Sequence, residues 1–392
     1  MKNKVTYFTS AMDNNSFKEY LSEWSIAPNL SNQNFHNKLI RSLALSMDVD
    51  VISVRSINKF YKHLMLKPKI VRENNIFWKY PLVKRSKIDK YLNLFKRIKK
   101  ITMQDSEIVF VDVLNLSLLK TAIKYASKYK MKIIGVCTDS PLNISFLSEG
   151  YKNKLLALGR TLDGYIVLTE KIGELYNVNH KPYVCIDGVS ELIETKPQTL
   201  VEGNYIYFGG SLMKEYGVYN LIDAFEKLER SDLKLVICGH HLSKKNLAEQ
   251  NKIVANENVT YLGALPYEEN IALEKGAILT VNPRPINEKI DEYSIPSKTL
   301  EFLSNGCLNV TVYNPLLAKH YEQCIVWAKT GEVDDLVDAM KKALELNRTE
   351  REMRSLLGKN KVMQYTSLEN VNKIIVNDLL SKLLLNWRSN FF

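Results

Sequence analysis

Short runs of β-branched residues alternate with helical stretches along most of the chain, and this alternation limits its possible folds most strongly. Strands that alternate with helices are typical of parallel sheets covered by helices on both faces. Because the runs are apolar almost throughout, we expect both faces of the sheets to be buried. In the first half, the predicted strands are 5–8, 49–54, 108–113, 132–137, 165–168 and 183–186. Helices such as 34–47 and 116–129 separate them.

The pattern is interrupted once, over residues 191–203, where hydrophobic periodicity is lost and Pro197 stands. It then resumes with strands 205–208, 233–238, 259–261, 278–281 and 309–312 and with helices near 216–229, 267–275 and 296–304. A chain of 392 residues is long enough for two cores, since one core stops growing near about 250–300 residues.

We therefore predict an α/β protein with two doubly wound, Rossmann-like domains, residues 1–190 and 203–365. A last helix, 366–392, is expected to pack back on the first domain. Ligands of such folds bind at the carboxyl ends of the strands, so we expect the function to lie in a cleft that the two domains face.

The cysteines and the start of the chain indicate the compartment. Five cysteines stand singly with no C-x-x-C pair, which favours a reducing cytoplasm over a disulfide framework or a zinc site. His240 and His241 are adjacent and have no acidic or cysteine partner at ligand spacing, so no metal site is predicted. Residues 1–4 are too short a leader for a signal peptide, and no run of about 18 apolar residues occurs. We expect a cytoplasmic protein that does not span a membrane.

The net charge of +11 is concentrated in residues 55–100, where 15 Lys and Arg stand against Glu73 and Asp89. Aromatic and leucine side chains are interleaved with these basic residues, a mixture that suits an anionic membrane surface. The apolar members are Phe60, Tyr61, Leu64, Phe77, Trp78, Tyr80, Tyr91, Leu94 and Phe95. A solvated basic face is the alternative, and we expect no nucleic-acid partner.

Residues 291–301, DEYSIPSKTLE, open a predicted helix with features of an anion site. Proline suits the first turn and Ser294 or Ser297 can cap it, which leaves backbone N–H groups near Ser297 and Lys298 free to face a phosphate. Lys298 adds a positive charge. Glu301, on the same face one turn later, could accept hydrogen bonds from two ribose hydroxyls. The alternative is a capped surface helix with a Lys–Glu pair.

Two further turns at strand ends point to the same region. Arg284 stands three residues after the predicted strand 278–281, at its carboxyl end, and a guanidinium there suits a diphosphate, although a neighbouring acid such as Glu288 could instead hold it. Gly209 and Gly210 end the strand 205–208 and permit close backbone approach to a ligand, with Lys214 following.

Several stretches together resemble the nucleotide-binding domain of GT-B glycosyltransferases, especially family 4. They are YFGGSLMKEYGVYNLIDAF, LVICG, NVTYLGALPYEE, LTVNPR and YSIPSKTLEFLSNG, over roughly residues 205–312. The likeness is closest to members that build bacterial capsule or exopolysaccharide, and it is weaker in the first half, at GVCTDSP, DGYIVLTE and KPYVCIDG. The resemblance implies the GT-B fold, a UDP- or GDP-sugar donor in the second domain, an acceptor in the first, and retention without a metal ion.

The resemblance also implies roles for single residues. Glu301 matches the second glutamate of the family's paired-glutamate motif, which holds the nucleotide ribose. The first glutamate's position carries Tyr293, and Glu292 stands one place before it. The family's arginine after the glycine turn is Ser211 here, and its lysine before the next glycine is Tyr216.

Diphosphate binding then rests on Lys214, Arg284 and Lys298. Asp139, after the first-domain strand 132–137, is a candidate to hydrogen-bond the donor or acceptor sugar. The other role open to Asp139 is capping the turn before Pro141.

These observations predict a retaining, hexosyltransferase-type glycosyltransferase for cell-surface polysaccharide, peripheral on the inner face of the plasma membrane. The nucleotide sugar is its donor substrate, no cofactor is expected, and the acceptor is a glycan or a lipid-diphosphate-linked sugar. A non-catalytic relative that serves as partner or scaffold of another glycosyltransferase is the alternative.

Overall fold

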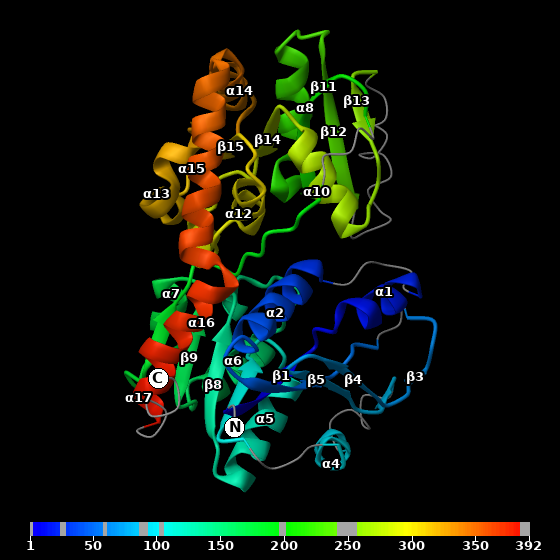
Figure 1. Ribbon diagram of the computed structural model, residues 1–392, viewed down its shortest axis with the longest axis vertical. Helices are drawn as coiled ribbons and strands as arrows, with labels where there is room; N and C mark the ends of the chain where they lie inside the picture. Colours follow the sequence, from blue (N-terminus) through cyan, green and yellow to red (C-terminus); the bar gives the residue numbers. More distant parts are fainter. Residues whose placement is uncertain are drawn as a thin grey trace. The chain divides into compact units, whose positions relative to one another are not determined.

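The computed structural model (Figure 1) describes residues 3–23, 29–57, 61–85, 93–101, 106–195, 201–240 and 257–384. The chain divides into two compact units. The first comprises Met1–Val189, Glu292–Ser294 and Thr366–Phe392, and the second comprises Ser190–Asp291 and Ile295–Tyr365.

The first unit is built on one eight-stranded sheet with the order β10-β9-β8-β7-β1-β2-β5-β4. Every neighbouring pair is parallel except β4 and β5, which form an antiparallel hairpin at one edge. The strands are β1 Lys4–Thr9, β2 Asp48–Ser53, β4 Lys69–Glu73, β5 Ile76–Tyr80, β7 Ile108–Asp112, β8 Lys132–Cys137, β9 Gly164–Val167 and β10 Tyr183–Cys185. A separate pair, β3 Met65–Leu66 and β6 Val83–Lys84, is antiparallel.

The helices of the first unit bury their apolar sides in one core with this sheet. They are α1 Asn14–Ser22, α2 Leu30–Leu43, α4 Leu94–Lys99, α5 Leu116–Tyr129, α6 Glu149–Gly159 and α7 Glu170–Tyr176. Helix α2 begins before the predicted residue 34 because the Asn29 side chain accepts a hydrogen bond from the Asn32 amide, 3.1 Å away.

The end of the chain also belongs to the first unit. Helix α16, Leu368–Ile374, continues through the π-helical turn Ile375–Leu380 into α17, Ser381–Leu383. The Ser42 hydroxyl on α2 donates to the Leu368 carbonyl at 2.7 Å, and Val371 and Leu379 are fully buried in the first core.

The structure corrects our interpretation of the aromatic residues in the basic segment 55–100. Hairpin β4–β5, which the sequence pattern did not predict, carries Trp78 and Tyr80 into the first core, where both are fully buried. Tyr61 and Leu94 are also almost completely buried. These side chains stabilise the fold and are unavailable to a bilayer, whereas Leu64 remains 67% exposed. Phe60 and Tyr91 lie outside the described residues.

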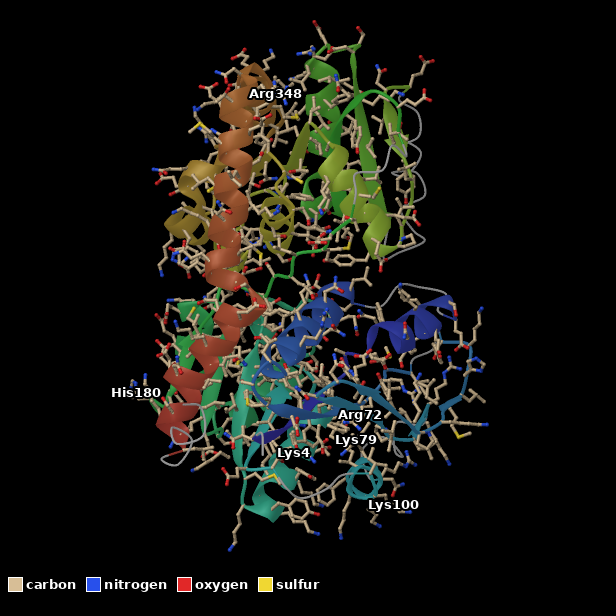
Figure 2. The ribbon with its side chains drawn as sticks, viewed as in Figure 1. Lys4, Arg72, Lys79, Lys100, His180 and Arg348 are labelled. Carbon is tan, nitrogen blue, oxygen red and sulfur yellow. The ribbon has the colours of Figure 1, made fainter. Side chains whose placement is uncertain are left out.

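One of the basic side chains in this segment is likewise internal. Figure 2 labels Lys79 on β5 and Lys4 on β1, and Asp50 lies on β2 between these strands. Lys79 Nζ is 2.6 Å from Asp50 Oδ2, and Lys4 Nζ is 3.4 Å from the same oxygen. Lys79 therefore neutralises a buried carboxylate.

The second unit has a six-stranded, fully parallel sheet with the order β13-β12-β11-β14-β15-β16. Its strands are β11 Asn204–Ser211, β12 Leu233–His240, β13 Val259–Tyr261, β14 Leu279–Asn282, β15 Asn309–Val312 and β16 Ile325–Ala328. Counted from β11, this is the doubly wound order 3-2-1-4-5-6, in which ligands bind where the order reverses. The reversal lies between β11 and β14.

In the described part of the second unit, six helices contribute to three smaller apolar clusters. They are α8 Val218–Lys227, α10 Tyr267–Gly276, α12 Ser297–Ser304, α13 Pro315–Tyr321, α14 Val333–Glu345 and α15 Arg348–Thr366. The short helix α11, Glu288–Asp291, precedes α12. The predicted bounds of α5, β8, β13 and β15 are confirmed, whereas β16, α14 and α15 were not predicted.

Candidate functional site

The carboxyl ends of β11 and β14 define the candidate site, because the strand order of the second sheet reverses between them. Gly209 and Gly210 lie in the last part of β11, and Asn282 ends β14. Helix α12 begins fifteen residues after β14 ends, and Asn282 Nδ2 donates to Thr299 Oγ1 on this helix at 2.9 Å. The ends of β11 and β14 and the start of α12 therefore lie together at the carboxyl ends of the central strands of the second sheet.

Packing explains the first glycine of the turn. Gly209 is buried, and a Cβ atom there would lie 2.6 Å from the Tyr207 hydroxyl. That hydroxyl donates to Asn270 Oδ1 on α10 at 2.9 Å, so it is held in place. Gly209 is thus required by the fold, whereas the partly exposed Gly210 remains a candidate for ligand contact.

Gly217 brings the turn after β11 against the loop that carries Arg284. Its φ is +76°, and a Cβ atom would lie 2.2 Å from the carbonyl oxygen of Pro283. A side chain is excluded on both counts, because positive φ disfavours L residues and the backbone oxygen cannot yield. The predicted cation Lys214 lies in the preceding 3-10 turn, Lys214–Tyr216, and is exposed.

Arg284 is held by an acid, and the acid is Asp291. Arg284 Nη2 lies 3.4 Å from Asp291 Oδ1, and Asp291 Oδ2 accepts a hydrogen bond from the Asn287 amide at 2.7 Å. Both charged side chains keep slightly under a fifth of their surface exposed. Arg284 also lines a small hollow with Asn282, Ile286, Asp291, Pro296, Thr311, Val312, Tyr313 and Asn314.

The start of α12 differs from the expectation in one respect. The helix begins at Ser297, and its cap residue is Pro296, which has no side-chain acceptor. The predicted serine cap is therefore absent, and Ser297 itself is exposed. Because an uncapped first turn leaves backbone N–H groups for another acceptor, this helix start suits an anionic ligand.

Lys298 and Glu301 form a close ion pair on α12. Lys298 Nζ lies 2.6 Å from Glu301 Oε1, with exposed side-chain fractions of 38% and 15%. Burial opposes the ammonium charge, but the nearby acidic groups, above all the Glu301 carboxylate, outweigh it and raise the pKa of Lys298. Lys298 therefore stays charged, as a phosphate ligand requires.

A third ionisable residue, Glu274, completes this group and was not predicted. It lies near the end of α10, is fully buried, and has its Oε1 atom 3.7 Å from Lys298 Nζ. Its Oε2 atom accepts a hydrogen bond from Asn305 Nδ2 at 2.7 Å. One signal was available in the sequence: Glu274 follows Ile271 by three residues, so it shares the apolar face of its helix.

The remaining predicted residues do not join this group within the second unit. Glu292 and Ser294 belong to the first unit, together with Tyr293, which packs against the first core. Asp139 follows β8 in the first unit, and its Oδ1 atom accepts a hydrogen bond from the Ser140 amide at 2.7 Å. The Ser140 hydroxyl accepts a hydrogen bond from the Leu142 amide and so caps the turn at Pro141.

The first unit holds a buried polar network that sequence analysis missed. It lies at the carboxyl end of β7, beside the reversal of the first sheet's order. Tyr7 Oη and His36 Nδ1 are 2.7 Å apart, and His36 Nε2 is 3.6 Å from Asp112 Oδ2. Burial lowers the pKa of His36, against the opposing effect of the Asp112 carboxylate. The imidazole is therefore neutral.

Within the described ranges, no group of three or more His, Cys, Asp or Glu side chains could hold a metal ion. In the same part of the chain, no helix combines the length and apolar character needed to cross a membrane.

Comparisons with known proteins agree with this architecture. Residues 190–361 match the family described as "Glycosyl transferases group 1". No curated protein sequence matches the chain.

Among solved structures, sucrose-phosphate synthase from Thermosynechococcus elongatus superposes with a TM-score of 0.71 at 10% identity, covering 95% of this chain and 97% of that one. Anabaena HepE in complex with UDP and glucose superposes with a TM-score of 0.68 at 11% identity, covering 97% of this chain and 100% of that one. The UDP-forming trehalose-phosphate synthase from Burkholderia xenovorans superposes with a TM-score of 0.66 at 10% identity, covering 97% of this chain and 100% of that one.

These similarities identify the fold as GT-B, with two Rossmann-like domains, and confirm the predicted fold class. The second unit contains a glycosyltransferase group 1 domain.

Proposed function

We propose that the protein is a retaining glycosyltransferase that moves a hexosyl group from a nucleoside-diphosphate sugar to a sugar acceptor. The observation that carries the proposal is the Lys298–Glu301 pair at the uncapped start of α12, within the group 1 domain and beside the reversal of strand order. Two structural neighbours support the donor class, since one is a complex of HepE with UDP and glucose and another its complex with UDP-glucose.

Each polar group has a role in donor binding. Glu301, which keeps 15% of its side chain exposed, accepts hydrogen bonds from the ribose hydroxyls. Lys298 and the first-turn amides of α12 neutralise the diphosphate, with Arg284 and Lys214 as further cations. Arg284 would leave Asp291 to do so, and their 3.4 Å separation is at the long end for such a pair.

The reaction proceeds on one face of the donor sugar. The bond between the anomeric carbon and the diphosphate oxygen breaks while the acceptor hydroxyl oxygen bonds to that carbon, and the departing phosphate oxygen takes the hydroxyl proton. No side-chain base is needed in this route. Charge grows on the leaving diphosphate, so side-chain cations and helix amides supply electrostatic stabilisation in place of a metal ion.

A surface of the first unit supports a peripheral membrane location and a lipid-linked acceptor. Lys120, Lys124 and Lys128 are exposed at four-residue spacing on α5, and neither α5 nor α4 contains an acidic residue. Lys124 and Lys128 lie 4.7 and 5.9 Å from the centre of the Phe95 ring on α4. We call six exposed lysines the lysine strip, three from α5 and three from α4 and its C-cap: Lys96, Lys99, Lys100, Lys120, Lys124 and Lys128.

Like charges are crowded within the lysine strip. The nearby Lys99 ammonium is the main cause of the lowered pKa of Lys128. Figure 2 labels Lys100, just after α4, in the same unit. An anionic bilayer would relieve this repulsion, which favours docking by the first unit.

Product analysis tests the proposed activity. Purified protein is incubated with UDP-glucose or GDP-mannose and with a lipid-diphosphate sugar, and the release of free nucleoside diphosphate is measured. We expect release that depends on the acceptor and an α-linked product from these α-linked donors. Binding of the nucleotide without release in any combination would instead support the non-catalytic scaffold.

A further inference from the structure

The buried carboxyl group of Glu274 has an unusual set of neighbours. Its side chain has no exposed surface, and Oε2 is satisfied by Asn305 Nδ2 at 2.7 Å. Oε1 is also buried and has no hydrogen-bond donor within the described part of the chain. The nearest cation, Lys298 Nζ, is 3.7 Å away, beyond hydrogen-bonding distance, and is already bound to Glu301 at 2.6 Å.

This arrangement is unfavourable if both glutamates are ionised. A buried carboxylate oxygen with no donor is costly, and two carboxylates sharing one ammonium would leave an uncompensated negative charge. A proton on Oε1 of Glu274 removes both problems at once. The oxygen becomes a donor, and the group of three side chains becomes neutral.

We propose that Glu274 is a positioning residue: as a neutral carboxylic acid, it donates a hydrogen bond from Oε1 to the Glu301 carboxylate and fixes that carboxylate for its ligand. The inference rests on the proposed function, in which this ligand is the nucleotide ribose. Glu274 comes from α10 and Glu301 from α12, so the bond also ties the two helices together.

Two causes keep Glu274 protonated. Burial raises its pKa well above the ordinary value, and the Glu301 carboxyl raises it further through its charge and a hydrogen bond, whereas Lys298 and Asn305 act in the opposite direction. The other titratable groups that interact with Glu274 are Tyr207, Cys238, Tyr267, Lys275 and Cys307. Burial raises the pKa of Cys238 to about 11, so this thiol adds no charge at neutral pH.

Two substitutions of Glu274 distinguish a need for a hydrogen-bond donor from a need for a negative charge. Glu274→Gln keeps the shape and supplies an amide N–H, so it reproduces the proposed acid. Glu274→Leu removes the donor. We expect the dissociation constant for UDP or GDP, measured by calorimetry, to stay within threefold of wild type in E274Q and to rise at least tenfold in E274L. Glu268→Leu, at an exposed position on the same helix, is the matched control and should bind as wild type does.

Equal losses in E274Q and E274L would show that the negative charge of Glu274 is needed, which overturns the proposal. Unchanged binding in both variants would overturn it as well. Thermal unfolding without ligand checks that E274L is folded; if it is not, the pH profile of nucleotide binding by E274Q replaces it. Above the pKa of Glu274, wild-type affinity should fall while E274Q affinity should not, and parallel profiles would contradict the proposal.

Infrared spectroscopy tests the protonation state without any nucleotide. At pH 8 the wild-type protein should show the carbonyl stretch of a protonated carboxylic acid, and E274Q should lack it. If this band is absent from the wild type, the proposal fails whatever the protein's activity. If the band is present but no nucleotide binds, Glu274 is protonated as proposed, but the proposed function is wrong, and so is the role of Glu274 in positioning Glu301 for ribose.

Discussion

Lys298 Nζ lies 2.6 Å from Oε1 of Glu301, one turn later on α12, while Oε1 of the buried Glu274 lies 3.7 Å from the same nitrogen. A cation and a carboxylate are thus placed side by side at the first turn of a helix. The proposed donor needs this pair of charges, since its diphosphate is anionic and its ribose hydroxyls are hydrogen-bond donors.

Removing a side-chain cation should slow transfer without creating a metal requirement. Lys298→Gln or Arg284→Gln should each lower kcat/KM at least tenfold, because about 1.5–3 kcal/mol is typical of a lost charge-assisted hydrogen bond. Transfer by the wild type should persist in EDTA. Lys227→Gln, an exposed lysine on α8, is the control. Strict dependence on added magnesium or manganese would contradict the mechanism.

The lysine strip should control binding to anionic vesicles. Replacing its six lysines with Gln should abolish sedimentation with phosphatidylglycerol vesicles at low salt, because each basic residue contributes on the order of 1 kcal/mol near such a surface. A protein with Lys341 and Lys342 replaced, both exposed on α14, should sediment as wild type does. If the wild type does not sediment, or if the strip variant sediments equally well, the membrane location is wrong.

Gly217 and Gly150 predict opposite effects of the same substitution. Gly217→Ala places a Cβ 2.2 Å from the Pro283 oxygen at a φ of +76°, so we expect a loss of about 1–3 kcal/mol in stability and a lower unfolding midpoint. Gly150, in α6, has no atom within 4 Å of its added Cβ, and Gly150→Ala should be neutral or stabilising by up to about 1 kcal/mol. An unchanged unfolding midpoint in Gly217→Ala would show that the loop carrying Arg284 can move to make room for the added Cβ atom.

His36 should make the protein sensitive to acid. Its pKa is lowered by burial, so as pH falls through about 6.5 the unfolded chain takes up a proton that the folded protein does not. Stability from this group is therefore present at pH 7.5 and lost toward pH 5. His36→Gln should reduce the drop in unfolding midpoint between these values, and equal drops in both proteins would exclude a neutral buried imidazole.

The sequence was sufficient to predict the α/β class because most strands of both sheets are nearly continuous apolar runs that stand between helices. The β4–β5 hairpin escaped prediction because basic residues interrupt the apolar runs of both strands, KIVRE and IFWKY, and a charged strand such as β4 resembles a solvated segment. Trp78 and Tyr80 were therefore taken for surface aromatics, although they are core residues.

At the candidate site, local spacing predicted that Lys298 and Glu301 share a helix face, and the structure places them in contact. Strand β14 and helix α11 lie between Glu274 and Glu301 in the chain, so the approach of these two residues depends on how α10 and α12 pack. The Asp291 partner of Arg284 depends likewise on the local course of the chain through α11. Such contacts between elements are not contained in any short sequence pattern.

The most direct test of the account is calorimetric titration of the wild-type protein and of Glu301→Ala with UDP and GDP. Glu301 accepts the ribose hydroxyls in the proposed complex, and a lost charge-assisted hydrogen bond costs about 1.5–3 kcal/mol. We predict that the wild type binds one of these nucleotides and that Glu301→Ala binds it at least tenfold more weakly, with an unfolding midpoint close to that of the wild type. Equal affinities in the two proteins would contradict the assignment of the donor site to α12.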